Sequence, residues 1–501
     1  MTASPHLREL PADPPQEATS LGSRRGVAIL LLLSLVQFMD ILDASILNIA
    51  LPSIKDDLGF SQQSLQWIVD GYLLTYGGFL LLGGRMADLL GRRIVLVTGL
   101  IVFAGSSLVG GLAHSSGLLV GARFAQGLGA AMLSPAALST LTTTFRAARD
   151  RHTALGVWGA VSGLGGAAGV LFGGLLTEGP GWRWVLFVNV PFSAVALAGA
   201  FALLRPERMR LRLREFDALG ALLVTGGMLL LVYALVKAPD VGWGATRTIA
   251  ELAAAAAILV AFVVNELRAA HPLVPLSILR VKGVAAADAT QMVAVGGFVP
   301  MFFFLTLYMQ TVLHYSPIET GLAYLPLTGG FIIGSGIVSQ LLTRLGTKPI
   351  VVAGAMVVAG GLYWLSRIPV DGSYVADILP GMLVTSLGGS GVFVGLTTAA
   401  NAGVSEARAG LAAGLLNTGQ QLGTALGLAV LSALATARTS SLLSGGHDLA
   451  QAATDGYGRG LLGGAAFVVA GGLITLLAAP NRRPSPAVAE EEPEPALDAA
   501  A

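Results

Sequence analysis

Four charged residues interrupt otherwise apolar stretches of the sequence: Asp40, Asp43, Asp70 and Arg123. A charge within a lipid bilayer is costly, so such residues usually mark a substrate or ion pathway. Burial favours the protonated form of a carboxyl group, whereas a nearby arginine favours its charged form. A carboxylate that an arginine approaches in one state and leaves in another can therefore take up and release a proton. Asp40 and Asp43 are three residues apart and share one face of a helix.

The composition tells us where these charges lie. The chain has 501 residues, of which 54% are hydrophobic and only 12% are charged, against roughly a quarter charged in soluble proteins. It has no cysteine, which excludes disulfide and zinc–thiolate chemistry. The net charge of +1 implies no bulk attraction to nucleic acid. We therefore expect an all-α polytopic membrane protein.

Fourteen apolar runs are long enough to be transmembrane helices, at approximately 27–50, 65–84, 93–113, 117–140, 154–176, 183–204, 216–237, 247–267, 284–313, 318–342, 348–367, 375–399, 409–435 and 459–479. Lys and Arg favour cytoplasmic loops. Most of the 30 Lys and Arg residues fall in alternate loops when the N-terminus is placed inside. This pattern predicts that both termini are cytoplasmic.

A short internal repeat predicts two related halves. The stretch "LLGRRIVLVTG" at 89–99 matches "RLGTKPIVVAG" at 344–354 in its glycines and following apolar run. Repeated halves are typical of transporters, which bind substrate at the interface between the halves. We therefore expect two six-helix bundles with two inserted helices between them. The expected segments are a cytoplasmic tail 1–25, bundles 26–204 and 283–480, a basic connector with the inserted pair at 205–282, and a disordered acidic tail 481–501.

Five stretches, taken together, resemble the fourteen-span drug:proton antiporter branch of the major facilitator superfamily. They are "LDASILNIALP" (42–52), "GGRMADLLGRR" (83–93), "RFAQGLGAA" (123–131), "GVWGAVSGLGGAAGVLFGG" (156–174) and "WRWVLFVNVP" (182–191). The resemblance implies a proton-driven exporter of amphipathic drugs or antibiotics that works by alternating access in the bacterial cytoplasmic membrane. It implies a small-molecule substrate and protons as partners, and no cofactor or metal; we expect a monomer.

The resemblance assigns expected roles to the buried charges. Asp43 corresponds to the first-helix acid of the branch and Arg123 to its fourth-helix arginine, so we expect Asp43 to bind the proton and Arg123 to modulate it. The alternative is a fixed structural ion pair. Asp40 is either a second protonation or cation-selecting site or a pore-lining residue without an essential role. We expect Asp70 to act at the outer gate or the helix start rather than in proton binding, and Asp288 to complement a helix dipole.

The loop "GGRMADLLGRR" predicts a cytoplasmic latch between the halves that breaks on switching, formed by Gly84, Asp88, Gly91, Arg92 and Arg93. Positive-inside anchoring alone would explain its arginines but not Asp88 or the glycines. Leu89 stands where the superfamily motif has a basic residue, which removes one partner from the latch.

The fifth predicted span carries glycines at small-residue spacing: Gly156, Gly165, Gly169, Gly173 and Gly174. Such spacing favours close helix packing in membranes, and the resemblance links it to antiport. Val170 replaces the proline that the antiporter motif has at this point. Candidate substrate-lining residues are Trp158, Gln310, Asn417 and Gln420. The apolar run Phe302, Phe303, Phe304, Tyr308 and Met309 either contacts an amphipathic drug or serves helix packing or lipid contact.

Other functions fit the sequence less well. A dedicated exporter or symporter of a single metabolite would share the same fold and is the main alternative. An enzyme is not expected, because the six histidines lie scattered in tails and loops and no nucleophile or metal cluster is apparent. The absence of a Walker-type phosphate loop disfavours ATP as the energy source.

Overall fold

The computed structural model describes residues 20–145, 147–205, 217–270, 272, 278, 281, 283–401 and 406–481. Within these ranges the chain is helical and contains no β-strand, which confirms the predicted all-α class. Most of the two predicted tails and the basic stretch 206–216 lie outside the described residues.

The first part of the chain forms a group of helices that pack mainly on one another, which we call the N-terminal group. Its members are α1 (Arg24–Leu58), α2 (Gln62–Leu65), α3 (Trp67–Leu90), α4 (Arg92–Gly111), α5 (Ser116–Thr144), α6 (Ala148–Glu178), α7 (Trp184–Phe187) and α8 (Asn189–Leu203). Within the group, α3 and α4 pack on α5, and α1 packs on α6.

The last part forms a second group, the C-terminal group. Its members are α11 (Val284–Phe298), α12 (Pro300–Leu307), η3 (Tyr308–Val312), α13 (Pro317–Ala323), α14 (Leu325–Leu345), α15 (Thr347–Leu365), η4 (Tyr374–Ile378), α16 (Leu379–Asn401), α17 (Glu406–Ser444) and α18 (Leu449–Ala478). Here α15 packs on α16 and α18, and α11 packs on α17 and α18.

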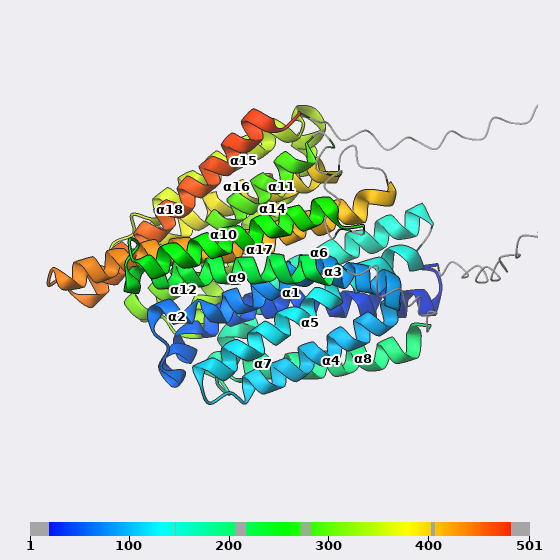
Figure 1. Cartoon of the computed structure of the whole chain (residues 1–501), viewed down its shortest axis with the longest axis horizontal. Helices are drawn as coiled ribbons and strands as arrows, with labels where there is room; N and C mark the ends of the chain where they lie inside the picture. The colour runs from blue at the N-terminus through cyan, green and yellow to red at the C-terminus, as the bar shows by residue number, and fades with distance from the viewer. Residues whose placement is uncertain are drawn as a thin grey trace, which may run out of the picture.

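Two helices between these groups correspond to the predicted inserted pair, α9 (Ala218–Val241) and α10 (Thr246–Arg268). They pack on each other, and α9 also contacts both α3 and α17. Figure 1 shows α9 and α10 running in roughly the same direction as α17, and α9 is the one of the two that packs on it. Helix α9 therefore covers the seam where the N-terminal group meets the C-terminal group, and α10 packs on α9.

Twelve helices or helical runs among the described residues are long and apolar enough to cross a membrane, so the chain is a multi-pass membrane protein. The second and fourth predicted spans correspond to α3 and α5, which are not among the twelve. Both helices carry buried ionisable side chains, Asp70 on α3 and Arg123 on α5, and such residues lower the mean hydropathy of a span. The total of fourteen spans remains a prediction.

The internal repeat is visible in the backbone. Gly91 ends α3 with φ of 96°, and Gly346 ends α14 with φ of 84°. Both values lie in the left-handed region, which glycine adopts without steric cost. A Cβ at Gly99 would lie 3.1 Å from the carbonyl oxygen of Gly129, and one at Gly354 would lie 2.8 Å from that of Gly388. Each pair of matched glycines thus makes the same turn and the same close helix approach.

The two groups meet at the end of the molecule farthest from the start of α1 and the end of α18, which we call the distal end (Figure 1). Gln310 Nε2 on η3 donates a hydrogen bond to the carbonyl oxygen of Ile49 on α1, at 2.9 Å. The amide of Ile318 on α13 donates to Glu178 Oε2 on α6, at 3.2 Å. Gly174 lets α6 approach α13, because a Cβ there would lie 2.7 Å from Ile318 Cα.

Helix α6 packs closely on α1 through three of the predicted glycines. A Cβ at these positions would lie 2.7–3.0 Å from carbonyl oxygens on three successive turns of α1, namely Gly165 against Phe38 (3.0 Å), Gly169 against Leu42 (2.9 Å) and Gly173 against Ile46 (2.7 Å). Gly156 differs from them, because a Cβ there would meet no described atom within 4 Å. Packing therefore explains Gly165, Gly169, Gly173 and Gly174, but the structure shows no packing role for Gly156.

This geometry predicts unequal effects of the same substitution at two glycines of α6. We expect Gly169→Val to lower the free energy of unfolding by about 1–3 kcal/mol, because the added side chain must push α6 away from α1. Gly156→Val is the matched control, since it changes helix propensity equally but has open space around it. Thermal unfolding of both variants in detergent micelles measures the difference. Equal losses of stability would show that close packing at Gly169 is unimportant.

Candidate functional site

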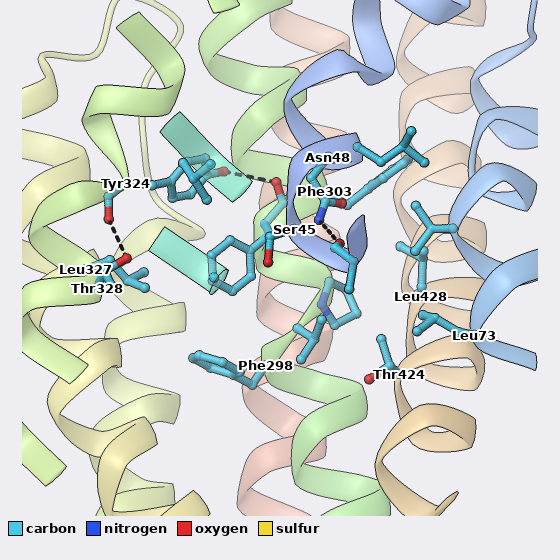
Figure 2. A pocket seen from close by; sticks show the side chains of 18 of the residues that line it. Ser45, Asn48, Leu73, Phe298, Phe303, Tyr324, Leu327, Thr328, Thr424 and Leu428 are labelled. Carbon is cyan, nitrogen blue, oxygen red and sulfur yellow. Dashed lines mark hydrogen bonds between the residues drawn. The ribbon is translucent and has the colours of Figure 1, made fainter. Parts of the chain in front are cut away.

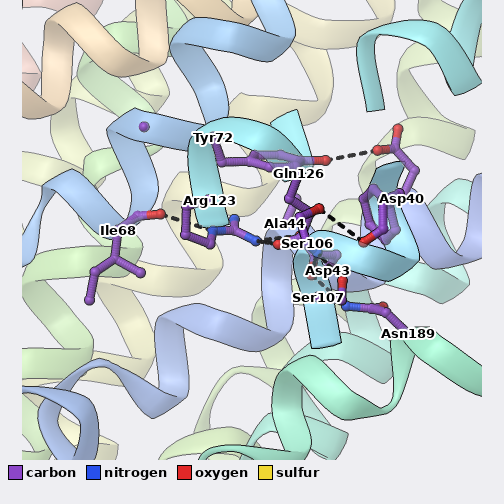
Figure 3. A network of polar contacts seen from close by, with 12 residues as sticks. Asp40, Asp43, Ala44, Ile68, Tyr72, Ser106, Ser107, Arg123, Gln126 and Asn189 are labelled. Atoms are coloured by element: carbon purple, nitrogen blue, oxygen red, sulfur yellow. Dashed lines mark hydrogen bonds and ion pairs between the residues drawn. The ribbon is translucent and has the colours of Figure 1, made fainter. Parts of the chain in front are cut away.

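The structure brings Asp43 and Arg123 together as a buried ion pair. Arg123 Nη1 on α5 lies 2.7 Å from Asp43 Oδ2 on α1 (Figure 3). Asp43 is 0% exposed and Arg123 is 2% exposed. The charged form of Asp43 is further stabilised by two amides, because Gln126 and Asn189 donate hydrogen bonds to its Oδ1, at 2.8 and 2.6 Å. This arrangement satisfies a charged carboxylate that is shielded from water.

Arg123 is likewise held from several sides. Its Nε donates to the carbonyl oxygen of Ile68 on α3, at 3.0 Å, and its Nη1 donates to Gln126 Oε1, at 2.6 Å. Its guanidinium lies 4.3 Å from the centre of the Tyr72 ring. Gln126 continues the network by donating to Ser107 Oγ on α4, at 2.8 Å. Five helices of the N-terminal group, α1, α3, α4, α5 and α8, therefore converge on one charge pair.

Asp40 lies one helical turn from Asp43 but has different partners. Tyr72 donates its hydroxyl proton to Asp40 Oδ1, at 2.8 Å, and Tyr76 donates to Oδ2, at 2.7 Å. The Tyr76 hydroxyl is also within hydrogen-bonding reach of Ser134 on α5 and Asn417 on α17. Asp40 is thus a buried carboxyl group held by two phenols, one of which connects it to the C-terminal group.

Sequence reasoning missed the neutral groups of this network. Gln126 and Asn189 lie within the stretches "RFAQGLGAA" and "WRWVLFVNVP". A neutral amide in an apolar helix does not stand out as a charged residue does, so neither residue was identified as part of a site. Tyr72 and Tyr76 were equally inconspicuous. Their spacing of four residues places both rings on the same face of α3, the face toward α1. This spacing identifies them as partners of Asp40 only once Asp40 is known to lie opposite that face.

A cavity of about 340 Å³ lies between the two helix groups. Figure 2 shows Phe298, Phe303, Tyr324 and Leu428 of the C-terminal group around it, facing Ser45 and Asn48 of α1. Most of its wall is apolar or aromatic, as in ligand-binding sites that combine a hydrophobic lining with a few polar groups. Arg123 and Tyr72 also line it, so the charge network of the N-terminal group reaches the cavity directly.

The predicted lining residues lie in different places. Gln420 lines the cavity and accepts a hydrogen bond from Gln291 Nε2, at 3.0 Å. Trp158, Gln310 and Asn417 do not line it. Trp158 packs against the apolar core of the N-terminal group, Gln310 bonds to α1 at the distal end, and Asn417 is near Tyr76. Helix α17 thus turns Gln420 toward the cavity and Asn417 toward α3.

The aromatic residues of the 302–308 region also separate. Phe302 and Phe303 line the cavity, whereas Phe304 and Tyr308 are buried elsewhere in the packing of the C-terminal group. The Phe302 ring lies 5.4 Å from that of Tyr324. Only part of this aromatic run therefore has access to a bound molecule.

The described contacts of the predicted latch lie within the N-terminal group. Arg92 Nη1 donates to Thr143 Oγ1 on α5, at 2.5 Å. Arg93 Nη2 donates to the carbonyl oxygen of Phe201 on α8, at 3.3 Å. A Cβ built on Gly84 would lie 3.5 Å from Pro135 Cβ, with no other described atom within 4 Å. Gly91 supplies the turn between α3 and α4. The side chain of Asp88 lies outside the described residues, and the latch remains a prediction.

Asp70 occupies the first turn of α3, where the sequence places it, and is 0% exposed. Neither of its carboxylate oxygens has a hydrogen-bond partner within the described part of the chain. Over the same ranges, no group of three His, Asp or Glu side chains is arranged to hold a metal ion.

The burial of the ion pair predicts a large loss of stability when one partner is removed. We expect Arg123→Met to lower the free energy of unfolding by about 3–5 kcal/mol, because it leaves the Asp43 carboxylate buried without its cation. Arg247→Met removes the exposed pair with Glu251 and is the control, since exposed pairs contribute little. Thermal unfolding at neutral pH measures both. A similar small loss in the two variants would contradict a charged, mutually dependent pair.

Known proteins give an independent view of this architecture. The sequence pattern described as Major Facilitator Superfamily matches residues 33–428. The chain is 39% identical to a puromycin resistance protein of Streptomyces alboniger over 483 residues, which cover 94% of each chain. It is 39% identical to a cephamycin export protein of Amycolatopsis lactamdurans over 468 residues, which cover 93% of this chain and 95% of the relative.

Solved structures agree on the fold. A bacterial homologue of the human lysosomal transporter Spinster superposes with a TM-score of 0.62 at 17% identity, covering 91% of this chain and 98% of that one. The Escherichia coli xylose transporter superposes with a TM-score of 0.59 at 15% identity, covering 91% and 97%. Sequence and fold together show that this multi-pass membrane protein belongs to the major facilitator superfamily.

Proposed function

We propose that the protein is a proton-driven exporter of amphipathic drugs or antibiotics. The observation that carries this proposal is that Arg123 both lines the cavity between the helix groups and forms an ion pair with the buried Asp43. The relatives named for puromycin resistance and cephamycin export support the substrate class. The apolar and aromatic cavity wall is suited to a molecule with a large apolar surface.

Arg123 connects the two binding events. While Asp43 is ionised, it neutralises Arg123, and the cavity presents little net positive charge to a substrate. A proton on Asp43 removes the negative partner and leaves the arginine charge facing the cavity, which disfavours a cationic substrate. Proton and substrate therefore compete through one side chain, as antiport requires. Asp40 is a second candidate proton site in this scheme, held by Tyr72 and Tyr76.

Alternating access needs two bodies that rock about the cavity. We propose that these are the bundles 26–204 and 283–480, with 205–282 providing the connector and the inserted pair α9 and α10. In this scheme the chain crosses the bacterial cytoplasmic membrane fourteen times with both termini in the cytoplasm, so the distal end faces outward. The loop of Gly84, Asp88, Gly91, Arg92 and Arg93 is the proposed cytoplasmic latch.

Proton coupling is tested in energised inside-out vesicles that are given a panel of amphipathic cations and antibiotics. We expect substrate-triggered proton release with the wild-type protein and none with Asp43→Asn, because the amide cannot bind the proton. Asp57→Asn is the matched control, since Asp57 is a half-exposed acid paired with Arg183 near the distal end of α1. Equal proton release from all three proteins would exclude Asp43 as the coupling site. A response to a single compound would favour the alternative of a dedicated exporter.

The cavity predicts which aromatic residues set the substrate range. We expect Phe302→Ala to change the resistance conferred on drug-sensitive cells several-fold, and in a compound-dependent way, because it removes a ring from the cavity wall. Phe304→Ala is the control, since Phe304 is buried in the same helix but does not line the cavity. Resistance is compared at matched membrane expression. A uniform loss of resistance for every compound in both variants would contradict substrate binding at this wall.

A further inference from the structure

Asp70 differs from the other buried acids of the N-terminal group in having no hydrogen-bond partner for its carboxylate within the described residues. Asp43 accepts hydrogen bonds from three side chains and Asp40 from two. Asp70 is equally buried, yet both of its oxygens lack a hydrogen-bond partner among the described residues. An ionised carboxylate in such a place carries its full desolvation cost. The dipole of α3 favours the charge near this helix start but contributes much less than burial removes.

Asp70 lies on the face of α3 that packs against the C-terminal group. It precedes Gly77 by seven residues, so the two share a face, separated by about 10 Å along the helix. Gly77 marks where this face meets α17, because a Cβ there would lie 2.9 Å from Gln421 Cβ and 3.3 Å from Leu422. Asp70 is therefore at the seam between the two groups, displaced from Gly77 toward the distal end.

Other polar atoms along this seam are also unsatisfied. Gln66 Oε1 on the α3 side and Ser432 Oγ on α17 are buried without a hydrogen-bond partner in the described chain. Gln66 precedes Gly77 by eleven residues and Ser432 follows Gln421 by eleven. Because α3 and α17 run in opposite directions, these two side chains lie at a similar level on the distal side of Asp70. Such a seam is better hydrated when α3 and α17 separate.

The charged and titratable groups around Asp70 form no hydrogen bond with its carboxylate among the described residues. On α17, residues 414–435 include no Asp, Glu, His, Lys, Arg, Tyr or Cys. On α5, Arg123 is bound to Asp43, Gln126 and Ile68. On α9, Tyr233 accepts a hydrogen bond from Arg247. Lys237, also on α9, makes a contact as well. The acids of α1, Asp40 and Asp43, and the tyrosines of α3, Tyr72 and Tyr76, bond to one another or to α5 and α8. Both oxygens of Asp70 therefore lack a bound counter-charge within the described part of the chain.

We propose that Asp70 binds a gating proton: its carboxyl group is protonated while α3 and α17 are packed together, and it ionises when the distal ends separate and admit water. The proposal rests on the alternating access proposed above and replaces the sequence expectation that Asp70 acts at the gate without binding a proton. On α3 the cavity is lined by Val69, Tyr72 and Leu73 but not by Asp70. The gating proton is therefore taken from the distal side and returned to it, unlike the transported proton on Asp43.

The natural absence of cysteine makes this proposal directly measurable. Cysteines introduced at the exposed Asp56, near the distal end of α1, and the exposed Ser444, at the distal end of α17, form a unique pair for spin labels. Pulsed EPR of the full chain in nanodiscs across a pH series gives the ratio of packed to separated distal ends. Each linked proton changes this ratio by about tenfold per pH unit over the range in which it titrates.

In the wild-type background we expect the packed population to fall as pH rises. Asp70→Asn is uncharged at every pH. We therefore expect the packed-to-separated ratio to lose the pH dependence that one proton contributes, about tenfold per pH unit, and the packed state to persist at high pH. Asp70→Thr is a second uncharged variant and should behave alike. Asp288→Asn is the matched control, because Asp288 on α11 also lacks hydrogen-bond partners among the described residues but is not on α3.

A slope in Asp70→Asn and Asp70→Thr equal to that of Asp288→Asn would overturn the gating proton. So would a smaller packed population in the Asp70 variants than in the wild type at high pH. This readout is separate from proton release in vesicles. If the Asp70 variants lose the pH dependence of the packed population while Asp43→Asn releases protons as the wild type does, the gating proton is supported and Asp43 is refuted as the coupling site. If the Asp70 variants keep that pH dependence while Asp43→Asn loses proton release, only the gating proton is refuted.

Discussion

The buried ion pair between Asp43 and Arg123 is the interaction on which the rest of the N-terminal group depends. Two charges withdrawn from water must recover their solvation from each other and from nearby dipoles, or the helix group cannot close around them. The structure meets this demand with amides from Gln126 and Asn189, a backbone carbonyl at Ile68 and the face of the Tyr72 ring. These groups come from separate helices, so the charge pair fixes how those helices pack.

Close helix packing supplies the precision that this network requires. The glycines of α6 bring its backbone against the carbonyl oxygens of α1, the helix that carries both Asp40 and Asp43. A neighbouring glycine, Gly174, serves the contact with α13 across the distal end. One run of small residues therefore both positions the acids and lets the two helix groups meet. Lipid offers no hydrophobic force between helices, so shape complementarity of this kind carries much of the packing.

The two helix groups contribute different chemistry to the cavity between them. The N-terminal group brings charge, through Arg123, while the C-terminal group brings aromatic and aliphatic surface, including Phe298, Phe302 and Tyr324. In the proposed mechanism, a substrate that touches both walls lies beside the arginine that is paired with Asp43, the proposed proton site. That mechanism needs no long-range relay, because Arg123 itself both lines the cavity and contacts Asp43.

The sequence by itself determined the helical class, the membrane and the family. It also singled out Asp43 and Arg123, which the structure pairs, because a charged residue in an apolar span stands out in the sequence. It also located the turn at Gly91 and its repeat at Gly346. Tertiary structure alone decided which neutral side chains complete the network and that Phe302 rather than Phe304 lines the cavity. It also showed that, among the described residues, Gly156 has no packing partner and the Asp70 carboxylate has no hydrogen-bond partner. The physical reason is that lipid is as apolar as a helix interface. Hydropathy therefore cannot tell which face of an apolar helix meets lipid, protein or cavity, and only the packed helices show it.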